Sequence, residues 1–136
     1  MQLEGRVWKD GKFWLAEIPA LDYVTQGHTK NEALSMAKNI VRTGVDKTGF
    51  KVSLKELEGN TFFIETNDPV ALLAHMLKRL RQKNGLSVRE ASKRLGSSSP
   101  NAFGVYEQGR VAPTIGKLEE LLKALHRQTT LTLKVA

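Results

Sequence analysis

The hydrophobic periodicity of the chain changes once, about halfway along. In the first half, apolar and polar residues mostly alternate, which is typical of strands that bury one face. In the second half, apolar residues recur at helical spacing, as Leu73, Met76 and Leu77 do. The pattern predicts an α+β protein with two domains. A small antiparallel sheet with one packed helix is expected over residues 1–66, and an all-α domain with a C-terminal strand over residues 67–136.

Turn and capping signals divide the first half into five strands and one helix. Asp10 and Gly11 lie between two alternating runs and predict a tight hairpin, because glycine accepts a positive φ. Gly27 is expected to turn the chain. Thr29 and Glu32 have capping-box spacing, in which each side chain accepts a hydrogen bond from the other residue's amide. The expected strands are 3–9, 13–18, 23–26, 52–56 and 61–65, and the expected helix runs from Thr29 to about Gly44.

Four helices are expected in the second half. Asp68-Pro69 is a helix-start signal, since Asp caps free amides and Pro suits the first helical position. Ser87 and Glu90 form a second capping box, which begins a short helix that Gly96 ends. The helices are expected to run from Pro69 to Gly85, from Ser87 to Gly96, from Pro100 to Gln108 with Ser99 as its cap, and from Thr114 onward. Two short helices joined by a glycine-containing turn are typical of a helix-turn-helix, whose second helix enters the major groove.

The distribution of charge along the chain bears on the kind of partner that each half binds. The net charge is +7, and residues 1–66 contribute none of it, because they hold nine Lys/Arg and nine Asp/Glu. The whole excess lies in the helical half, which indicates either an anionic partner for that half or a solvated basic surface. The chain has no cysteine, no long apolar run and no signal-peptide pattern at its start, so we expect a soluble, cytoplasmic protein with no membrane contact.

The stretch Tyr106-Glu107-Gln108-Gly109-Arg110, followed by Ala112-Pro113-Thr114 and a leucine-rich helix, resembles the Cro/CI-type helix-turn-helix family. The resemblance covers about Pro69 to Leu125. It implies binding to double-stranded operator DNA. The chain departs from the family pattern between Gly96 and Tyr106, where it is one residue longer, so the turn between the two helices is altered.

Candidate DNA-binding residues follow from chemistry and from this resemblance. Asn101 can read adenine through its amide, and Gly104 would permit close approach of the groove. The predicted set is Arg89, Ser99, Asn101, Gly104, Gln108, Arg110 and Lys117, in which Arg89, Arg110 and Lys117 are assigned to phosphates. Two alternatives stay open: Ser99 as a cap only, and Asn101 as an ordinary surface residue. Phe103, Val105 and Tyr106 are expected to pack against the core, and Lys78, Arg79, Arg81 and Lys83 to form a solvated face.

A second resemblance lies in the first half. The run from Phe13 to Asp22, then Thr25-Gln26-Gly27-His28-Thr29 and Asn31-Glu32-Ala33, resembles the N-terminal domain of HicB antitoxins. The resemblance implies a partial RNase H-like fold, a HicA-like toxin as partner and repression of the shared operon. HicA-type toxins are small ribonucleases that cleave messenger RNA, and HicB-type antitoxins mask them.

The residues themselves give no sign of catalysis. RNase H chemistry needs convergent carboxylates that hold divalent metal ions, whereas the acidic residues here are scattered over strands and turns. His28, His75 and His126 are far apart and are expected at the surface or at helix ends. Trp8, Phe13 and Trp14 are expected in the core, with the alternative that exposed aromatic residues at a sheet edge hold a partner protein. We therefore expect no enzyme, no catalytic residue, no cofactor and no metal site.

Three hypotheses remain at this stage. The leading one is a type II antitoxin that also represses its own operon. The alternative is a stand-alone Cro/CI-type repressor whose first domain senses a small molecule, and the third is an RNase H-like nuclease. Residues 129–135 alternate like a single strand, which is unstable alone, so we expect it to pair with the same strand of a second copy and to form a homodimer or higher homo-oligomer.

Overall fold

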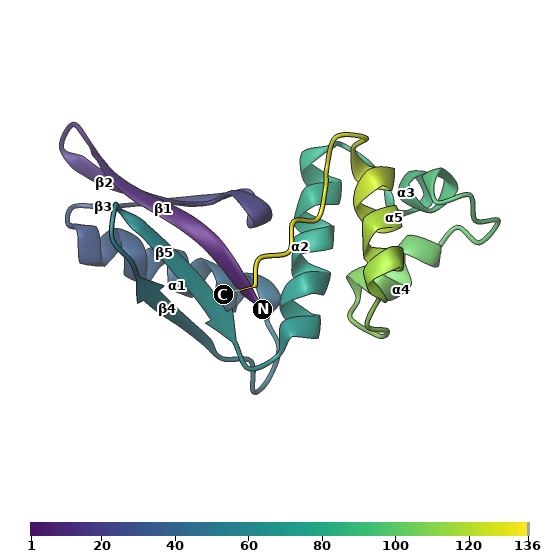
Figure 1. Cartoon of the computed structure of the whole chain (residues 1–136), viewed down its shortest axis with the longest axis horizontal. Helices are drawn as coiled ribbons and strands as arrows, with labels where there is room; N and C mark the ends of the chain where they lie inside the picture. Colours follow the sequence, from purple (N-terminus) through teal and green to yellow (C-terminus); the bar gives the residue numbers. More distant parts are fainter. Residues whose placement is uncertain (136) are drawn as a thin grey trace. The chain divides into compact units, whose positions relative to one another are not determined.

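Five antiparallel strands and one helix make up the first of two units in the computed structural model (Figure 1). The structure describes residues 1–135, and its contacts divide the chain between Leu72 and Leu73. The strand order in the sheet is β3-β2-β1-β5-β4. The elements of this unit are β1 (Gln2–Asp10), β2 (Phe13–Ile18), a 3-10 turn (Pro19–Leu21), β3 (Tyr23–Gly27), α1 (Lys30–Val45), β4 (Val52–Glu56) and β5 (Thr61–Thr66).

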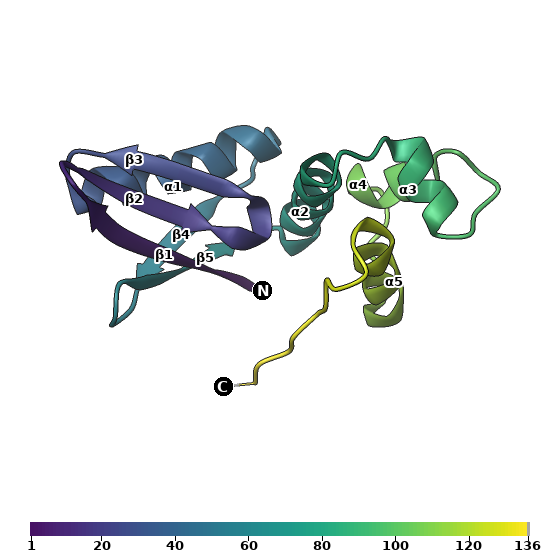
Figure 2. The same ribbon diagram turned by 90° about the horizontal axis from the view of Figure 1, so that it is seen from above.

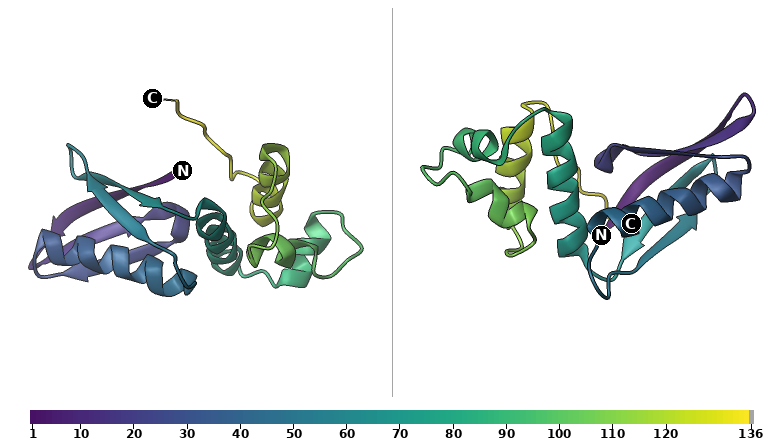
Figure 3. Two further views of the ribbon diagram at one scale, coloured as in Figure 1. Left: turned by 90° about the horizontal axis from the view of Figure 1, so that it is seen from below. Right: turned by 180° about the vertical axis from the view of Figure 1, so that it is seen from behind.

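The core of this unit lies between the sheet and α1, which covers one face of the sheet (Figures 2 and 3). The strand register places Val7 opposite Ala16, and Gly5 opposite Phe62, so these residues share a face. That face and the inner side of α1 are buried together; the helix contributes Ala33, Leu34, Ala37 and Val41. The predicted alternation along the strands is confirmed, and with it the α+β class.

Gly27 has a different role from the predicted turn. It is the last residue of β3, and a Cβ added there would lie 2.5 Å from the backbone nitrogen of Ala33. The neighbouring Thr25 is buried, and its hydroxyl donates to the Ala33 carbonyl at 2.9 Å. The Thr25-Gln26-Gly27 run therefore packs β3 closely against the first turns of α1, where only glycine leaves enough room.

The capping of α1 is confirmed in part. The Thr29 hydroxyl accepts from the Glu32 amide at 3.1 Å, as predicted, but the Glu32 carboxylate accepts from the amide of His28 rather than that of Thr29. The helix continues past Gly44 and ends at Val45, because Asp46 adopts the left-handed conformation with φ 47°. Aspartate tolerates that conformation better than most residues.

The second unit consists of α2 (Pro69–Lys83), α3 (Val88–Arg94), α4 (Ala102–Glu107) and α5 (Ile115–Leu125). The division between the units lies inside α2, whereas the sequence predicts a boundary at residue 67. The start of α2 is held within the first unit: the Asp68 carboxylate accepts from the Ala71 amide at 3.0 Å and pairs with Lys47 at 2.6 Å. The hydrogen bond from Lys47 lowers the pKa of Asp68.

Residues 129–135 form no strand in the single chain that the structure describes. Leu133 and Val135 are 77% and 85% exposed. A strand needs a neighbouring strand to pair with its backbone groups. Pairing with a second copy therefore stays a prediction, and Ala136 lies outside the described residues.

The three aromatic residues predicted in the core, Trp8, Phe13 and Trp14, are instead half-buried. Trp8 lies on the sheet face opposite α1, since the adjacent Val7 faces inward. Phe13 contacts the ring of His28, with their centroids 5.3 Å apart. The first unit thus leaves aromatic surface outside its core.

His75 in α2 is only 8% exposed, so the prediction of a surface position is wrong. Burial is the main cause that lowers the pKa of His75 from 6.5 to about 4, and the nearby charges of Arg79 and Lys78 add to it. The folded protein thus takes up this proton less readily than the unfolded chain. The neutral His75 side chain therefore contributes to the free energy of unfolding above pH 6.5. This contribution is lost as the pH falls from 6.5 to about 4.

The replacement His75→Gln should therefore flatten the acid side of the stability profile. Each pKa unit corresponds to about 1.4 kcal/mol, so the wild type should lose about 3 kcal/mol more than the variant across that pH window. Urea denaturation at a series of pH values measures this difference. Gln82→Ala, at an exposed position on the same helix, removes no titratable group, so it is the control and should keep the wild-type profile. Parallel profiles for His75→Gln and the wild type would contradict the assignment.

Candidate nucleic-acid interface

A buried serine of α3 connects helices α3 and α4 by a hydrogen bond. The Ser92 hydroxyl in α3 donates to the Val88 carbonyl at 2.8 Å and accepts from the Phe103 amide at 3.0 Å. Phe103 is the second residue of α4, and its amide has no partner within its own helix. Ser92 therefore caps the start of α4 from a neighbouring helix. Sequence reasoning missed it, because the capping rules consider only residues close along the chain.

The replacement Ser92→Ala should destabilise this unit by about 1–3 kcal/mol, since it leaves the buried Phe103 amide without an acceptor. Thermal unfolding followed by circular dichroism measures the loss. Ser98→Ala, at an exposed position in the same region, should change stability by no more than about 0.5 kcal/mol. If Ser92→Ala lowers stability no more than Ser98→Ala does, the hydrogen bond between the Phe103 amide and the Ser92 hydroxyl does not stabilise this unit.

The predicted start of α4 at Pro100 is wrong by two residues. The helix begins at Ala102, and Asn101 is its N-cap residue, without a side-chain capping bond. Ser99 belongs to a turn: its amide donates to the Ser97 hydroxyl at 3.1 Å, and its carbonyl accepts from the Ala102 amide at 3.3 Å. The longer connection forms a loop that projects beyond α3 and α4 (Figures 1 and 2). Ser99 and Asn101 both lie there and are exposed.

Gly104 is buried, so its predicted position on the groove-facing surface is wrong. A Cβ added at Gly104 would overlap Oδ1 of Asn101 and would lie 3.2 Å from Cγ1 of Val88. The glycine therefore makes room for Asn101 on one side and for α3 on the other. The close approach that Gly104 permits is internal to the protein.

Gln108 and Arg110 lie at the opposite end of α4. Gln108 is the C-cap residue, and the following Gly109 is left-handed, with φ 71°. The Arg110 amide then donates to the Val105 carbonyl at 3.2 Å, which closes the helix end. Both the Gln108 and Arg110 side chains are exposed. The Arg110 guanidinium is thus presented at the surface by a fixed turn.

Arg81 and Glu107 form a bidentate ion pair, which contradicts the prediction that Arg81 lies on a solvated face. The two nitrogen–oxygen distances are 2.6 and 2.7 Å, and the side chains are 13% and 9% exposed. Arg81 also donates to the Leu86 carbonyl at 2.7 Å. The hydrogen bonds to Glu107 raise the pKa of Arg81. This pair fixes the C-terminal end of α4 against α2.

The two remaining predicted phosphate ligands differ in their surroundings. Arg89 is exposed in the first turn of α3. Lys117 lies in the first turn of α5, is half-buried and pairs with Glu120 at 2.9 Å. The hydrogen bond to Glu120 raises the pKa of Lys117. Lys117 would have to leave this carboxylate, or share it, in order to bind a phosphate.

The structure thus brings the predicted residues together in pairs rather than as one cluster. Ser99 and Asn101 lie before α4, while Gln108 and Arg110 lie after it. Their contacts with DNA stay predictions. The polar side chains of the first pair can meet base edges, and Arg110 can neutralise a phosphate at the other end.

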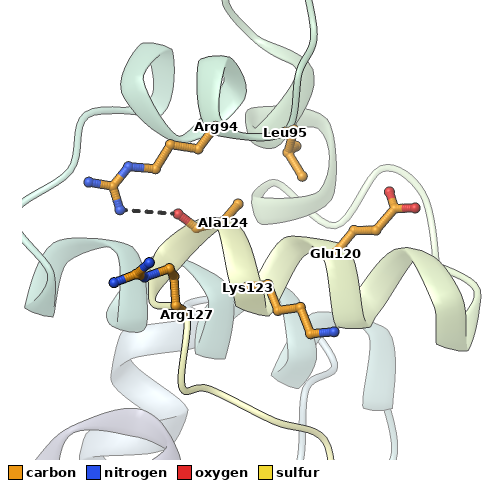
Figure 4. A pocket seen from close by; sticks show the side chains of 6 residues that line it. All are labelled: Arg94, Leu95, Glu120, Lys123, Ala124 and Arg127. Atoms are coloured by element: carbon orange, nitrogen blue, oxygen red, sulfur yellow. Dashed lines mark hydrogen bonds between the residues drawn. The ribbon is translucent and has the colours of Figure 1, made fainter.

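A shallow cleft of about 610 Å³ lies between the end of α3 and the second half of α5 (Figure 4). Arg94 lines it and donates to the Ala124 carbonyl at 3.4 Å. Arg127 and Lys123 also line it, near the C-terminal end of α5. Cations at this end of a helix are stabilised by its free carbonyl groups, so the basic lining has a structural explanation.

Residues 1–135 contain no group of three or more His, Cys, Asp or Glu side chains arranged to hold a metal ion. None of their helices has both the length and the apolar character needed to cross a bilayer.

Comparison with known proteins gives one similarity, in the second half of the chain. Residues 72–133 match the model of a family described as a helix-turn-helix domain. The comparisons with curated proteins and with solved structures gave no match for the chain. This match supports a DNA-binding helix-turn-helix in the region from α2 to α5, in which α3 and α4 have the order of the two helices of the motif.

Proposed function

We propose that this chain is a HicB-type antitoxin that represses its own operon and neutralises a HicA-like, mRNA-cleaving toxin. In this proposal the helix-turn-helix unit binds operator DNA as a dimer, and the sheet unit binds the toxin in the cytoplasm. Both activities are binding events, and neither requires catalysis by this chain. The observation that supports the DNA-binding part of the proposal is the helix-turn-helix match over residues 72–133, in the half of the chain that holds the entire net charge of +7. The toxin-binding part rests on the resemblance of residues 13–33 to HicB antitoxins.

The sheet face opposite α1 supports a protein partner. Trp8 and Leu15 are register partners on this face, and both are half-buried. Val24 on the neighbouring strand is 59% exposed. Arg6 and Glu17 form an ion pair at 2.8 Å beside them. Aromatic and aliphatic surface edged by charged groups is typical of protein–protein interfaces.

Co-expression with each of the genes that flank this one tests the toxin assignment, because a HicA-like toxin is expected among them. We expect the two products to purify as a complex and the neighbour's RNA cleavage to stop when this chain is added. Trp8→Ser should weaken the complex, whereas Lys38→Ala, at an exposed position on α1, should not. If no complex forms and a small metabolite instead changes DNA affinity, the stand-alone repressor is correct and the antitoxin is not.

The replacement Arg110→Ala should weaken binding to specific and random duplexes alike. A phosphate contact is independent of sequence, so its loss should also lower the salt dependence of affinity by roughly one unit of slope. Fluorescence anisotropy at several salt concentrations measures both effects. Arg42→Ala, in the sheet unit, is the control and should leave the slope unchanged. A change of base preference at constant slope would instead assign Arg110 to a base.

A further inference from the structure

The recognition helix α4 itself offers few polar groups to DNA. Phe103 and Gly104 are buried, and Glu107 is ion-paired with Arg81. Ala102 and Val105 are half-buried and apolar. Such residues can contact the methyl group of thymine, but they cannot form hydrogen bonds with base edges. Tyr106, which is half-buried and close enough to Lys117 of α5 to affect its pKa, carries the remaining hydrogen-bonding side chain of α4. Most hydrogen-bonding readout must therefore come from residues outside the helix.

The exposed polar groups lie just before α4, on the projecting loop. Ser98, Ser99 and Asn101 are all exposed. The base of this loop is fixed, because the Ser97 amide donates to the Ser92 carbonyl at 3.3 Å. Ser92 also caps α4 on the other side of the loop, so both ends of the loop are held by one residue of α3.

We infer that Asn101 is the principal base-reading side chain and that Gly104 is its positioning residue. The missing Cβ of Gly104 leaves the space into which Oδ1 of Asn101 fits. An asparagine amide held in one place can accept from N6 and donate to N7 of adenine together. With Ala102 and Val105 beside it, Asn101 selects an A·T pair in each half-site. The inference rests on the proposed binding of operator DNA.

A double-mutant cycle tests this coupling. Wild type, Asn101→Ala, Gly104→Ala and the double variant are each used to select duplexes from a random pool, and the affinities for the wild-type site are then measured. Each single replacement should lower the preference for adenine at one position by roughly 5- to 100-fold. The double variant should be no worse than Asn101→Ala, because the added Cβ then meets no amide. Affinity for random duplexes and its salt slope should stay at wild-type values.

One further variant distinguishes a loss of adenine preference from a loss of stability. The Cβ of Gly104→Ala also lies close to Val88, so the variant can lose stability for that reason. Val88→Ala combined with Gly104→Ala restores space on the α3 side and should recover the melting temperature but not the adenine preference. Unchanged preference in Asn101→Ala, or fully additive effects in the cycle, would overturn the inference. Absence of any duplex binding by the wild type would instead overturn the proposed function.

Discussion

Glu107→Ala should lower the free energy of unfolding of the helix-turn-helix unit by about 3–5 kcal/mol, because it leaves the buried Arg81 guanidinium without its carboxylate. The two side chains are 9% and 13% exposed and share two short hydrogen bonds. A charge in such surroundings is poorly hydrated, so removing one partner costs far more than the pair contributes. Urea denaturation followed by circular dichroism measures the loss.

Two controls define the cause. The double variant Arg81→Met with Glu107→Leu removes both charges and should recover most of the stability, since apolar side chains often replace a buried ion pair at little cost. Glu17→Ala breaks the pair between Glu17 and Arg6, where Arg6 is 65% exposed, and should cost no more than about 1 kcal/mol. Similar losses for Glu107→Ala and Glu17→Ala would show that burial does not amplify the Arg81 pair.

Features that depend on neighbours along the chain were predictable. Asp10-Gly11 forms the expected hairpin turn, with φ 60° at Gly11. The Ser87–Glu90 capping box is present with both of its hydrogen bonds. Asp68 caps α2 as predicted. In both caps the donor and acceptor are three residues apart along the chain, so the sequence contains the whole interaction.

Features that depend on how elements pack were not predictable from one sequence. Arg81 and Glu107 are 26 positions apart, and nothing in their spacing indicates a pair. The sequence predicts a turn at Gly27 and a groove-facing position for Gly104. In the structure, Gly27 instead leaves room for the start of α1, and Gly104 leaves room for Asn101 and for α3. Glycine marks a place where a Cβ does not fit, and only the fold shows what occupies the space.

The start of α4 shows how local and tertiary signals can conflict. Ser99-Pro100 is a good helix-start signal, but its bonds are used in a turn, and the helix begins later at Ala102. The amide that a local cap would satisfy is bonded instead to Ser92 of α3. A cap from another helix fixes the angle between α3 and α4 as well as the helix start, which a local cap cannot do.

Deleting residues 129–136 should convert the proposed dimer into a monomer and lower operator affinity by roughly 10²- to 10⁴-fold. One recognition helix covers few base pairs, so two half-sites read together depend on the link between two copies. The segment has the alternation of a strand, and Leu133 and Val135 are exposed in the single chain. Light scattering measures the mass, and anisotropy with a two-half-site duplex measures the affinity.

A matched pair of variants locates the cause within this segment. Replacing Leu133 and Val135 by serine should reproduce the deletion, because these side chains share one face of the predicted strand. Replacing Thr130 and Thr132 by serine alters the other face and should leave the mass and the affinity unchanged. Affinity for a single half-site should be the same in all variants, since the bases are read by the region around α4. An unchanged mass after deletion would place the contact between copies elsewhere, and the alternating segment would then need another partner strand.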